Sequence, residues 1–436
     1  MTDVHITVEM LRAVARGEVA PRILIESGIE HLAALCPHCR EELKAWQAEQ
    51  GPAAIRPEAL LQALPSVLSR HAMEAEAKRR EAEQDFRELS ALPHATRMTR
   101  VRRATKRFRG VILAGMLLTE SKRVVAGDPG AALELAQTAE AVLLQSRAVS
   151  GIADLYVRSA AFQANALRAK GLLQEARSRF AFARFLIQQE GVTDPALIAE
   201  VDSCEAVLAL DQRRFADAEK LLHRSIQMYA IAGERISASQ PMLTLGRLYA
   251  LRGEYAKATE LAQAAAETAG EGNPRLALYA RHNQATYLCE AGSFETAAKT
   301  IDEARDLYEE FSDSFTQRRL AWLEGKIAAG RGRLEEAEQA FLTVRQALID
   351  EALGYDAALL SIDLALLYAR QGRTAELKSL AEQMHFLFVF LEIHREAAAA
   401  LVLFQEAARQ ETATGAMLEE LASYLKRARG NMEPPF

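Results

Sequence analysis

The sequence predicts an all-α fold, a right-handed superhelical α-solenoid of long helix pairs that follows a small helical module at the N-terminus. Strong helix formers, above all alanine and leucine, dominate the 436 residues, and runs of β-branched residues are nearly absent. A short pattern around a turn residue recurs along much of the chain. One compact core rarely organises more than about 250–300 residues, so a repeat array accounts best for this length.

Half of the residues are hydrophobic, 26% are charged, and the formal net charge is −6. Such a mild charge argues against bulk attraction to nucleic acid or anionic lipid. Apolar runs such as residues 111–118 are too short to cross a bilayer, and Asp3 and Glu9 interrupt the start where a secretory signal would need an apolar stretch. Two of the four cysteines are isolated in helical patterns, so we expect no disulfide framework and a cytoplasmic location.

Residues 1–48 form the first predicted unit, a small helical module that carries the residues of a zinc site. Cys36 and Cys39 in a C-x-x-C turn offer two thiolates to one ion, His31 precedes them, and His5 lies near the start of the chain. Four such ligands would close a tetrahedral site, so the one cofactor we expect is a structural zinc ion. His38 could replace either histidine, and the alternative is a three-helix module whose cysteines are merely buried.

This arrangement resembles the zinc-binding fold of bacterial anti-sigma factors, in which a distant Cys or His is followed by H-x3-C-x2-C. Here the spacing is H-x4-C-x2-C, which moves His31 about 100° further around a helix. The resemblance implies a sigma factor as the partner of this module, although a fold name alone does not carry function.

Residues 49–109 are predicted to form a helical, charged linker. Pro52, Pro57 and Pro65 mark the break after the module, and a basic run ends the linker. The run comprises Arg97, Arg100, Arg102, Arg103, Lys106, Arg107 and Arg109. Such a run can meet phosphates or an acidic surface, but only Phe108 could stack on a base. We therefore favour a helix that packs Met98, Val101 and Ala104 on the solenoid, and we do not expect a nucleic-acid partner.

Residues 110–394 are predicted to form the repeats. In four segments an apolar residue is followed by a turn glycine four positions later, at Gly253, Gly292, Gly332 and Gly372. The series extends upstream to Gly171, Arg213 and, more weakly, Gly127, so that neighbouring turns lie 39–44 residues apart. Each unit then consists of two helices and a tight turn, where a glycine accepts the left-handed conformation that ends a helix.

Other local features support the same units. Asp194-Pro195 and Asn273-Pro274 are typical helix starts, with a polar N-cap and proline in the first helical position. Small residues in the second helix would let it approach the first closely, and larger residues would fill the space beside the turn. The small residues are Ala258, Ala297 and Ala337, and the larger ones are Tyr255, Phe294 and Leu334.

The repeats resemble the tetratricopeptide repeat (TPR) family over roughly positions 110 to 410. Gly246 and Tyr249 in one unit, and Trp322, Leu323 and Gly325 in a later one, match the family's first-helix signature. The family's standard unit has 34 residues, so these units are longer by about a helical turn and a half. Longer units of this kind recur in bacterial peptide-sensing regulators and in kinesin light chains. The resemblance implies a solenoid that binds other proteins.

Residues 395–436 are predicted to form capping helices and a tail. The segment 384–391 before them is apolar on nearly every side, which is typical of a buried helix. We expect the last helices, including residues 401–404, to cover it. The alternative is an exposed patch that binds a partner.

In the TPR family the first helix of each unit lines an inner groove. Carrying the family's groove positions onto this sequence gives Arg247, His282, Arg319, Trp322, Lys326 and Arg370. These residues are mostly basic, so the resemblance implies that the groove binds a protein partner or an acidic peptide.

The sequence shows no phosphate-binding glycine loop, no H-E-x-x-H and no G-x-S-x-G, and Cys204 and Cys289 lie within repeat helices. We therefore expect no enzyme. The chain is predicted to be a non-enzymatic, bacterial-type scaffold or regulator that captures a protein or peptide in the solenoid groove. One alternative is an anti-sigma-type transcription regulator that acts through the zinc module, and another is a structural assembly subunit.

Overall fold

The computed structural model describes residues 76–105, 107–146, 151–351, 353–390 and 416–420, which form helices and their connections with no β-strand among them. The chain divides into two compact units, Met1–Glu81 and Ala82–Phe436. The predicted module of residues 1–48 lies outside the described residues. The repeats lie in the second unit.

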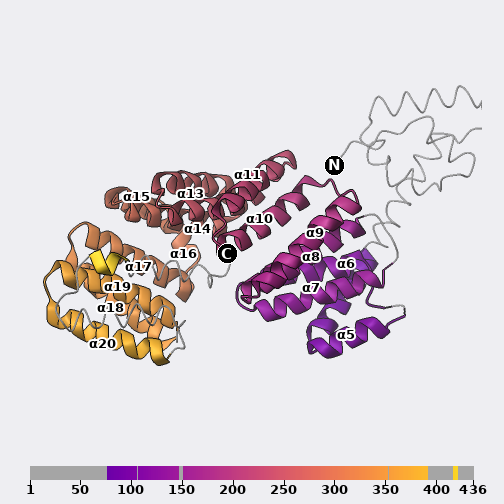
Figure 1. Cartoon of the computed structure of the whole chain (residues 1–436), viewed down its shortest axis with the longest axis horizontal. Coiled ribbons are helices and arrows are strands. Elements are labelled where there is room, and N and C mark those ends of the chain that lie inside the picture. The colour runs from indigo at the N-terminus through magenta and orange to yellow at the C-terminus, as the bar shows by residue number, and fades with distance from the viewer. Residues whose placement is uncertain (1–75, 106, 147–150, 352, 391–415, 421–436) are drawn as a thin grey trace, which may run out of the picture. The chain divides into compact units, whose positions relative to one another are not determined.

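Seven helix pairs follow one another in the described part of the second unit (Figure 1). Each pair has a first and a second helix joined by a short turn, and in the fifth pair the second helix is divided in two. In chain order the pairs are α6 (Val111–Val124) with α7 (Pro129–Leu144), α8 (Ile152–Ala169) with α9 (Leu173–Gln189), α10 (Pro195–Asp211) with α11 (Phe215–Ile231), α12 (Ser239–Leu251) with α13 (Tyr255–Ala269), α14 (Pro274–Glu290) with α15 (Phe294–Glu303) and α16 (Arg305–Glu310), α17 (Ser314–Gly330) with α18 (Leu334–Asp350), and α19 (Gly354–Arg370) with α20 (Thr374–Phe390).

The substantial contacts between these helices lie within a pair or between neighbouring pairs. Each first helix packs on its own second helix, on the second helix of the preceding pair and on the neighbouring first helices. The buried apolar residues form successive clusters along the chain rather than one central core. This arrangement confirms the predicted α-solenoid.

Six of the seven predicted turn residues have a positive φ. Gly253 has φ 75°, and Gly171, Gly292, Gly332 and Gly372 share this conformation. Arg213 adopts it as well, with φ 57°, although a side chain disfavours it. Gly127 is the exception, because α6 ends there without a left-handed residue.

The close approach of paired helices also agrees with the prediction. Ala258, Ala297 and Ala337 are fully buried. At Gly246 a Cβ atom would lie 3.3 Å from the carbonyl oxygen of Ala258, so the glycine leaves room for the second helix. The N-caps at Asp194 and Asn273 are formed too, and their side chains accept hydrogen bonds from backbone N–H groups of the first turn. Asp128 and Asp313 cap α7 and α17 in the same way, which the sequence analysis missed.

Three arginines of the basic run before the repeats, Arg97, Arg100 and Arg107, contact acceptors of the protein itself. Arg97 is buried in α5 (His94–Arg103), and its guanidinium donates to the carbonyl oxygens of Leu89 and Leu92 at 2.9 and 3.0 Å. Arg107 pairs with Asp85 and Glu88 at 2.6 and 2.5 Å.

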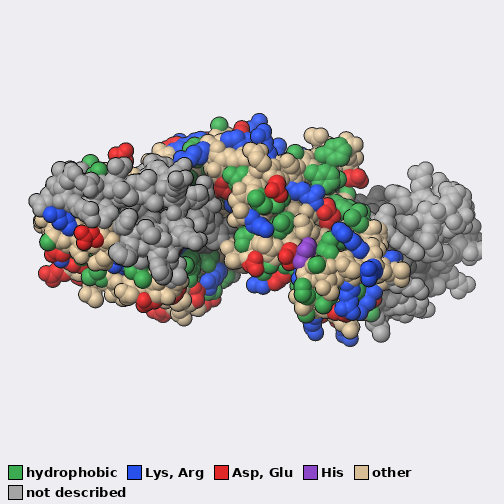
Figure 2. Space-filling model, turned by 60° about the horizontal axis from the view of Figure 1, so that its bottom comes forward, with side chains coloured by type: hydrophobic (Ala, Val, Ile, Leu, Met, Phe, Trp, Pro, Cys, Tyr) green, Lys and Arg blue, Asp and Glu red, His purple; other side chains and the backbone are tan. Residues whose placement is uncertain are grey.

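The apolar face of this segment packs as predicted. Val101 is buried in the first core cluster along the chain, whose buried residues run from Ala82 to Leu208, and Met98 and Ala104 pack against it. On the coloured part of the face seen in Figure 2, positive, negative and apolar side chains are mixed over most of the surface, and positive side chains gather at its lower right.

At the other end, the predicted cap is described only in part. Leu418, in the short helical segment 416–420, is buried in the cluster formed with α17 to α20. Residues 391–415 and 421–436 lie outside the described residues, as do the side chains of residues 385–390. The expected burial of that apolar segment therefore stays a prediction.

The tight packing of pairs predicts opposite effects of two glycine substitutions. In α17 a Cβ atom at Gly325 would lie 2.7 Å from Cε1 of Phe341, a fully buried ring, so Gly325→Ala is expected to destabilise the protein by about 1–3 kcal/mol. In α6 a Cβ atom at Gly115 would meet nothing within 4 Å, so Gly115→Ala is expected to stabilise by up to about 1 kcal/mol. Urea unfolding followed by circular dichroism measures the free energy of unfolding of both variants. A change of the same sign in both would contradict the described packing at these two glycines.

Candidate functional site

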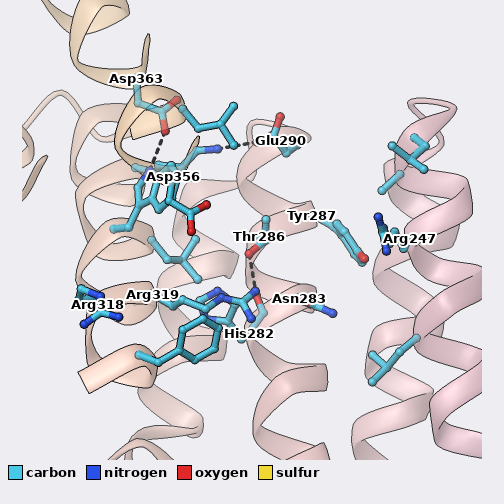
Figure 3. Close-up of a pocket in the computed structure, with 18 of the residues that line it drawn as sticks. Arg247, His282, Asn283, Thr286, Tyr287, Glu290, Arg318, Arg319, Asp356 and Asp363 are labelled. Atoms are coloured by element: carbon cyan, nitrogen blue, oxygen red, sulfur yellow. Dashed lines mark hydrogen bonds and ion pairs between the residues drawn. The ribbon is translucent and has the colours of Figure 1, made fainter. Parts of the chain in front are cut away.

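A cavity of about 350 Å³ opens between the first helices of the solenoid. Side chains from α10, α12, α14, α17 and α19 line it, together with side chains from α13 and α18. Its volume lies in the range of sites that bind small ligands or parts of a peptide. Figure 3 shows its charged and polar lining residues.

Five of the six predicted groove residues meet in this cavity. Arg247 reaches it from α12, His282 from α14, and Arg319, Trp322 and Lys326 from α17. The last three are three and four residues apart, a spacing that places side chains on one face of a helix. The sixth residue, Arg370, lies at the exposed end of α19 and is not part of the lining.

Three large apolar side chains line the cavity and are partly open to solvent. Leu251 ends α12, Phe315 lies in the first turn of α17, and Leu353 precedes α19; their exposed fractions are 36, 42 and 37%. The sequence analysis did not select them, because apolar residues at helix ends are usually core. Apolar surface left in a concave site favours a ligand that covers it.

Lys326 and Trp322 link three first helices across the cavity wall. The Lys326 ammonium lies 2.5 Å from Glu290 on α14. Burial alone would lower the pKa of Lys326, but Asp363 and Glu290 outweigh it, so its pKa is raised and the side chain stays charged. The Trp322 indole N–H donates to Asp363 on α19 at 2.7 Å, as the dashed line in Figure 3 marks. These contacts fix the walls before any ligand binds.

His282 lines the cavity, but it does not contribute to the basic character of the groove. Its ring is buried, and Nδ1 lies 2.8 Å from the hydroxyl of Tyr308. Burial, with a further contribution from Arg319, lowers the pKa of His282 well below its usual value, so the ring is neutral at pH 7. Tyr308 lies on α16, which follows a break in the helix at Ala304 that no sequence pattern indicated.

The cavity is also less basic than predicted. Glu290, Asp356 and Asp363 line it alongside the arginines and Lys326. Arg318 pairs with Glu351 at 2.5 Å, and the guanidinium of Arg319 lies over the Phe315 ring, 5.7 Å from its centre. The expectation was incomplete because the groove positions carried over from the family included no carboxylates. The resulting site has mixed charge.

The two cysteines in the described residues have the core character that the sequence predicted. Cys289 is buried in α14, and Cys204 in α10 packs against the first core cluster. Burial raises the pKa of each thiol to about 11, so both are protonated at neutral pH and are poor nucleophiles. Neither cysteine is among the residues that line the cavity.

The predicted zinc ligands cannot be placed. His5, His31, Cys36 and Cys39, with His38 as the alternative, lie outside the described residues. Within the described ranges, no group of three or more His, Cys, Asp or Glu side chains could hold a metal ion. Nor is any helix there both long and apolar enough to span a bilayer.

Comparison with known proteins finds similarity only at the level of structure. No protein-family model and no curated protein matches the sequence. A Rap protein solved in complex with competence and sporulation factor is similar with a TM-score of 0.55 and 14% identity, over 73% of this chain and 87% of that one. The apo form of RapI gives 0.55 and 12%, over 72% and 86%.

A third structure, aspartyl phosphate phosphatase F from Bacillus subtilis, gives a TM-score of 0.46 at 13% identity, over 73% and 85% of the two chains. This similarity is too low to support a conclusion about the fold. The two Rap structures show a shared TPR-like helical repeat fold, which agrees with the family resemblance of the repeats.

The neutral, buried His282 predicts a loss of stability in acid. Because the pKa of His282 is lowered in the folded protein, its imidazole is protonated in the unfolded chain at a higher pH than in the folded one. The free energy of unfolding should therefore fall as the pH drops below about 6.5, by up to about 1.4 kcal/mol per pH unit. His282→Asn should make the dependence shallower between pH 7.5 and 5.5. His223→Asn, at an exposed position on α11, is the matched control. Unfolding midpoints that fall equally in all three proteins would contradict this assignment.

Proposed function

We propose that this protein is a non-enzymatic regulator or scaffold that captures a short peptide, or an extended segment of a partner protein, in the cavity between its first helices. One observation carries the proposal: partly exposed apolar side chains and fixed polar groups from several helix pairs line one cavity of about 350 Å³. Leu251, Phe315 and Leu353 supply the apolar surface. Trp322 and Lys326 are already bonded within the wall, so binding needs little reorganisation there.

A peptide suits this site better than a compact small molecule. The lining comes from α10, α12, α14, α17 and α19, and an extended chain can contact several such helices in succession. The Rap structure with bound competence and sporulation factor supports the proposal by analogy of fold, since that protein too was solved with a bound factor.

Capture of a ligand across several pairs gives a physical route to regulation. The cavity walls belong to different pairs that contact each other mainly through their neighbours. A ligand that touches all the walls favours one relative arrangement of these pairs, and it shifts the population toward that arrangement by its differential affinity. A partner that binds elsewhere on the solenoid would then sense the ligand.

The proposed action is binding without chemistry. The thiols of Cys204 and Cys289 are kept protonated by burial, and His282 is a neutral, buried hydrogen-bonding group. The free thiols of Cys204 and Cys289 also fit our proposal of a cytoplasmic location.

The two alternatives have no specific support in the described residues. An anti-sigma role and the structural zinc ion both depend on the module of residues 1–48, outside the described residues, and we retain zinc as a proposal for that module. A structural assembly subunit would show strong, concentration-dependent self-association.

The test compares capture by matched variants of the full chain. Phe315→Glu places a charge in the apolar lining and should abolish retention of the ligand from an extract of the source cells, as identified by mass spectrometry. Phe185→Glu, at a 53% exposed phenylalanine on α9 outside the cavity, should leave retention unchanged. Captured peptides should be recovered chemically intact. The proposal would be refuted if the unaltered protein and both variants retained the same set of peptides. Systematic cleavage of the captured peptides would refute it as well.

A further inference from the structure

A second concave surface lies at α5, and the proposed function does not use it. Threonine and arginine side chains of this helix form most of its lining, together with residues just after the helix. The lining residues are Ala95, Thr96, Thr99, Arg100, Arg103, Ala104, Arg107 and Phe108. Thr96, Thr99, Arg100 and Arg103 are spaced by three, one and three residues, so they share one face of α5. None of the lining residues belongs to the cavity between the first helices.

The arginines of this concave surface outnumber the carboxylates that contact them. Arg107 lies 2.6 Å from Asp85 and 2.5 Å from Glu88, and Arg100 lies 2.8 Å from Glu88. Two carboxylates therefore compensate two of the three guanidinium groups. The third arginine, Arg103, is exposed and contacts no carboxylate among the described residues. One positive charge of the lining is thus left for a ligand.

The excess of positive charge continues beside the concave surface. Arg102 and Arg109 are exposed too, and neither pairs with a carboxylate in the ranges that the structure describes. Glu134 belongs to the other end of α5, where it lies 4.0 Å from His94 and attracts the buried guanidinium of Arg97. In Figure 2 positive side chains gather at the lower right, on the side of the molecule where Figure 1 shows α5. We call the five exposed arginines the arginine surface: Arg100, Arg102, Arg103, Arg107 and Arg109.

We propose that the arginine surface is a second binding site, which takes an acidic segment of a partner protein and binds one of its carboxylates at Arg103. The planar guanidinium group matches a carboxylate, and Arg107 already binds the carboxylates of Asp85 and Glu88 within the protein. The ten residues of α5 span about 15 Å, and the surface is open, so it suits a segment with several carboxylates better than a small enclosed anion.

Nucleic acid and lipid fit the arginine surface less well. Phe108 is buried, and the guanidinium of Arg107 lies 4.6 Å from the centre of its ring, so this ring is not free to stack on a base. The net charge of −6 adds a long-range repulsion from phosphates. A lipid surface would need large exposed apolar side chains beside the arginines, and the lining offers only alanines and the buried Phe108.

The experiment measures binding of a fluorescent helical peptide to the full chain by anisotropy. The peptide has about 14 residues and carries glutamates three and four positions apart, so that they lie on one face. The unaltered protein should bind it, and the affinity should fall as the salt concentration rises, because salt screens exposed charges. The same peptide with glutamines in place of the glutamates should bind about tenfold more weakly or worse. This comparison uses the unaltered protein, so it holds even if a variant does not fold.

The protein variants assign the peptide to its surface. Arg103→Glu should weaken binding of the acidic peptide about tenfold, since it reverses the charge that no described carboxylate compensates. Arg177→Glu, at an exposed arginine on α9 outside the arginine surface, makes the same change of charge and should leave the affinity unchanged. Phe315→Glu should leave it unchanged too, so this site and the proposed function are tested separately.

Three results would overturn this inference. One is equal affinity for the glutamate and glutamine peptides, and another is an affinity that Arg103→Glu leaves unchanged or that Arg177→Glu or Phe315→Glu lowers as much. The third is a DNA duplex of about 20 base pairs that displaces the peptide at a lower concentration than the unlabelled peptide does, which would make nucleic acid the better partner.

Discussion

The structure depends on one constraint: a pair of helices is too thin to bury its own apolar faces and must share them with the neighbouring pairs. Residues such as Phe180 and Phe341 are fully buried only because the next helix covers them. This sharing sets the first helices side by side, so that side chains from α10 to α19 can line one cavity. The site is thus a consequence of stacking rather than a feature of any single unit.

Polar contacts then fix how neighbouring pairs align. Near the turns an arginine of one unit reaches a glutamate on the second helix of the unit before it, as Arg252 does with Glu219 and Arg373 with Glu338. Partly exposed pairs of this kind contribute only about 0–1 kcal/mol each, so they align the units more than they stabilise them. The half-buried pair of Lys326 and Glu290 lies in the cavity wall, where it also sets the local charge. Fold stability and ligand selection therefore share residues.

The sequence was sufficient for the repeats and for most of the cationic lining. The interval between turns located the junction between the two helices of each pair, and it held even at Arg213, where the residue type is unfavourable. Five of the six groove residues meet in the cavity because positions on one helix face repeat predictably. Arg370 does not join them, since it lies at the last residue of α19.

The other features of the cavity could be found only in the structure, because they depend on contacts between different helix pairs. The neutrality of His282 follows from burial and from Tyr308 on α16, and the helix break that separates α16 from α15 has no marker in the sequence. The cavity lining brings Glu290 together with Asp363, 73 positions further along the chain. The function of the module in residues 1–48 still depends on the sequence pattern alone.

The central claim is that a ligand bridges several stacked pairs at this cavity, and hydrogen–deuterium exchange of the full chain with and without a captured peptide tests it most directly. The account predicts slower exchange in α12, α14, α17 and α19 together, with little change in α6 and α7, which do not line the cavity. Slower exchange confined to one helix pair, or found only outside these four helices, would contradict it.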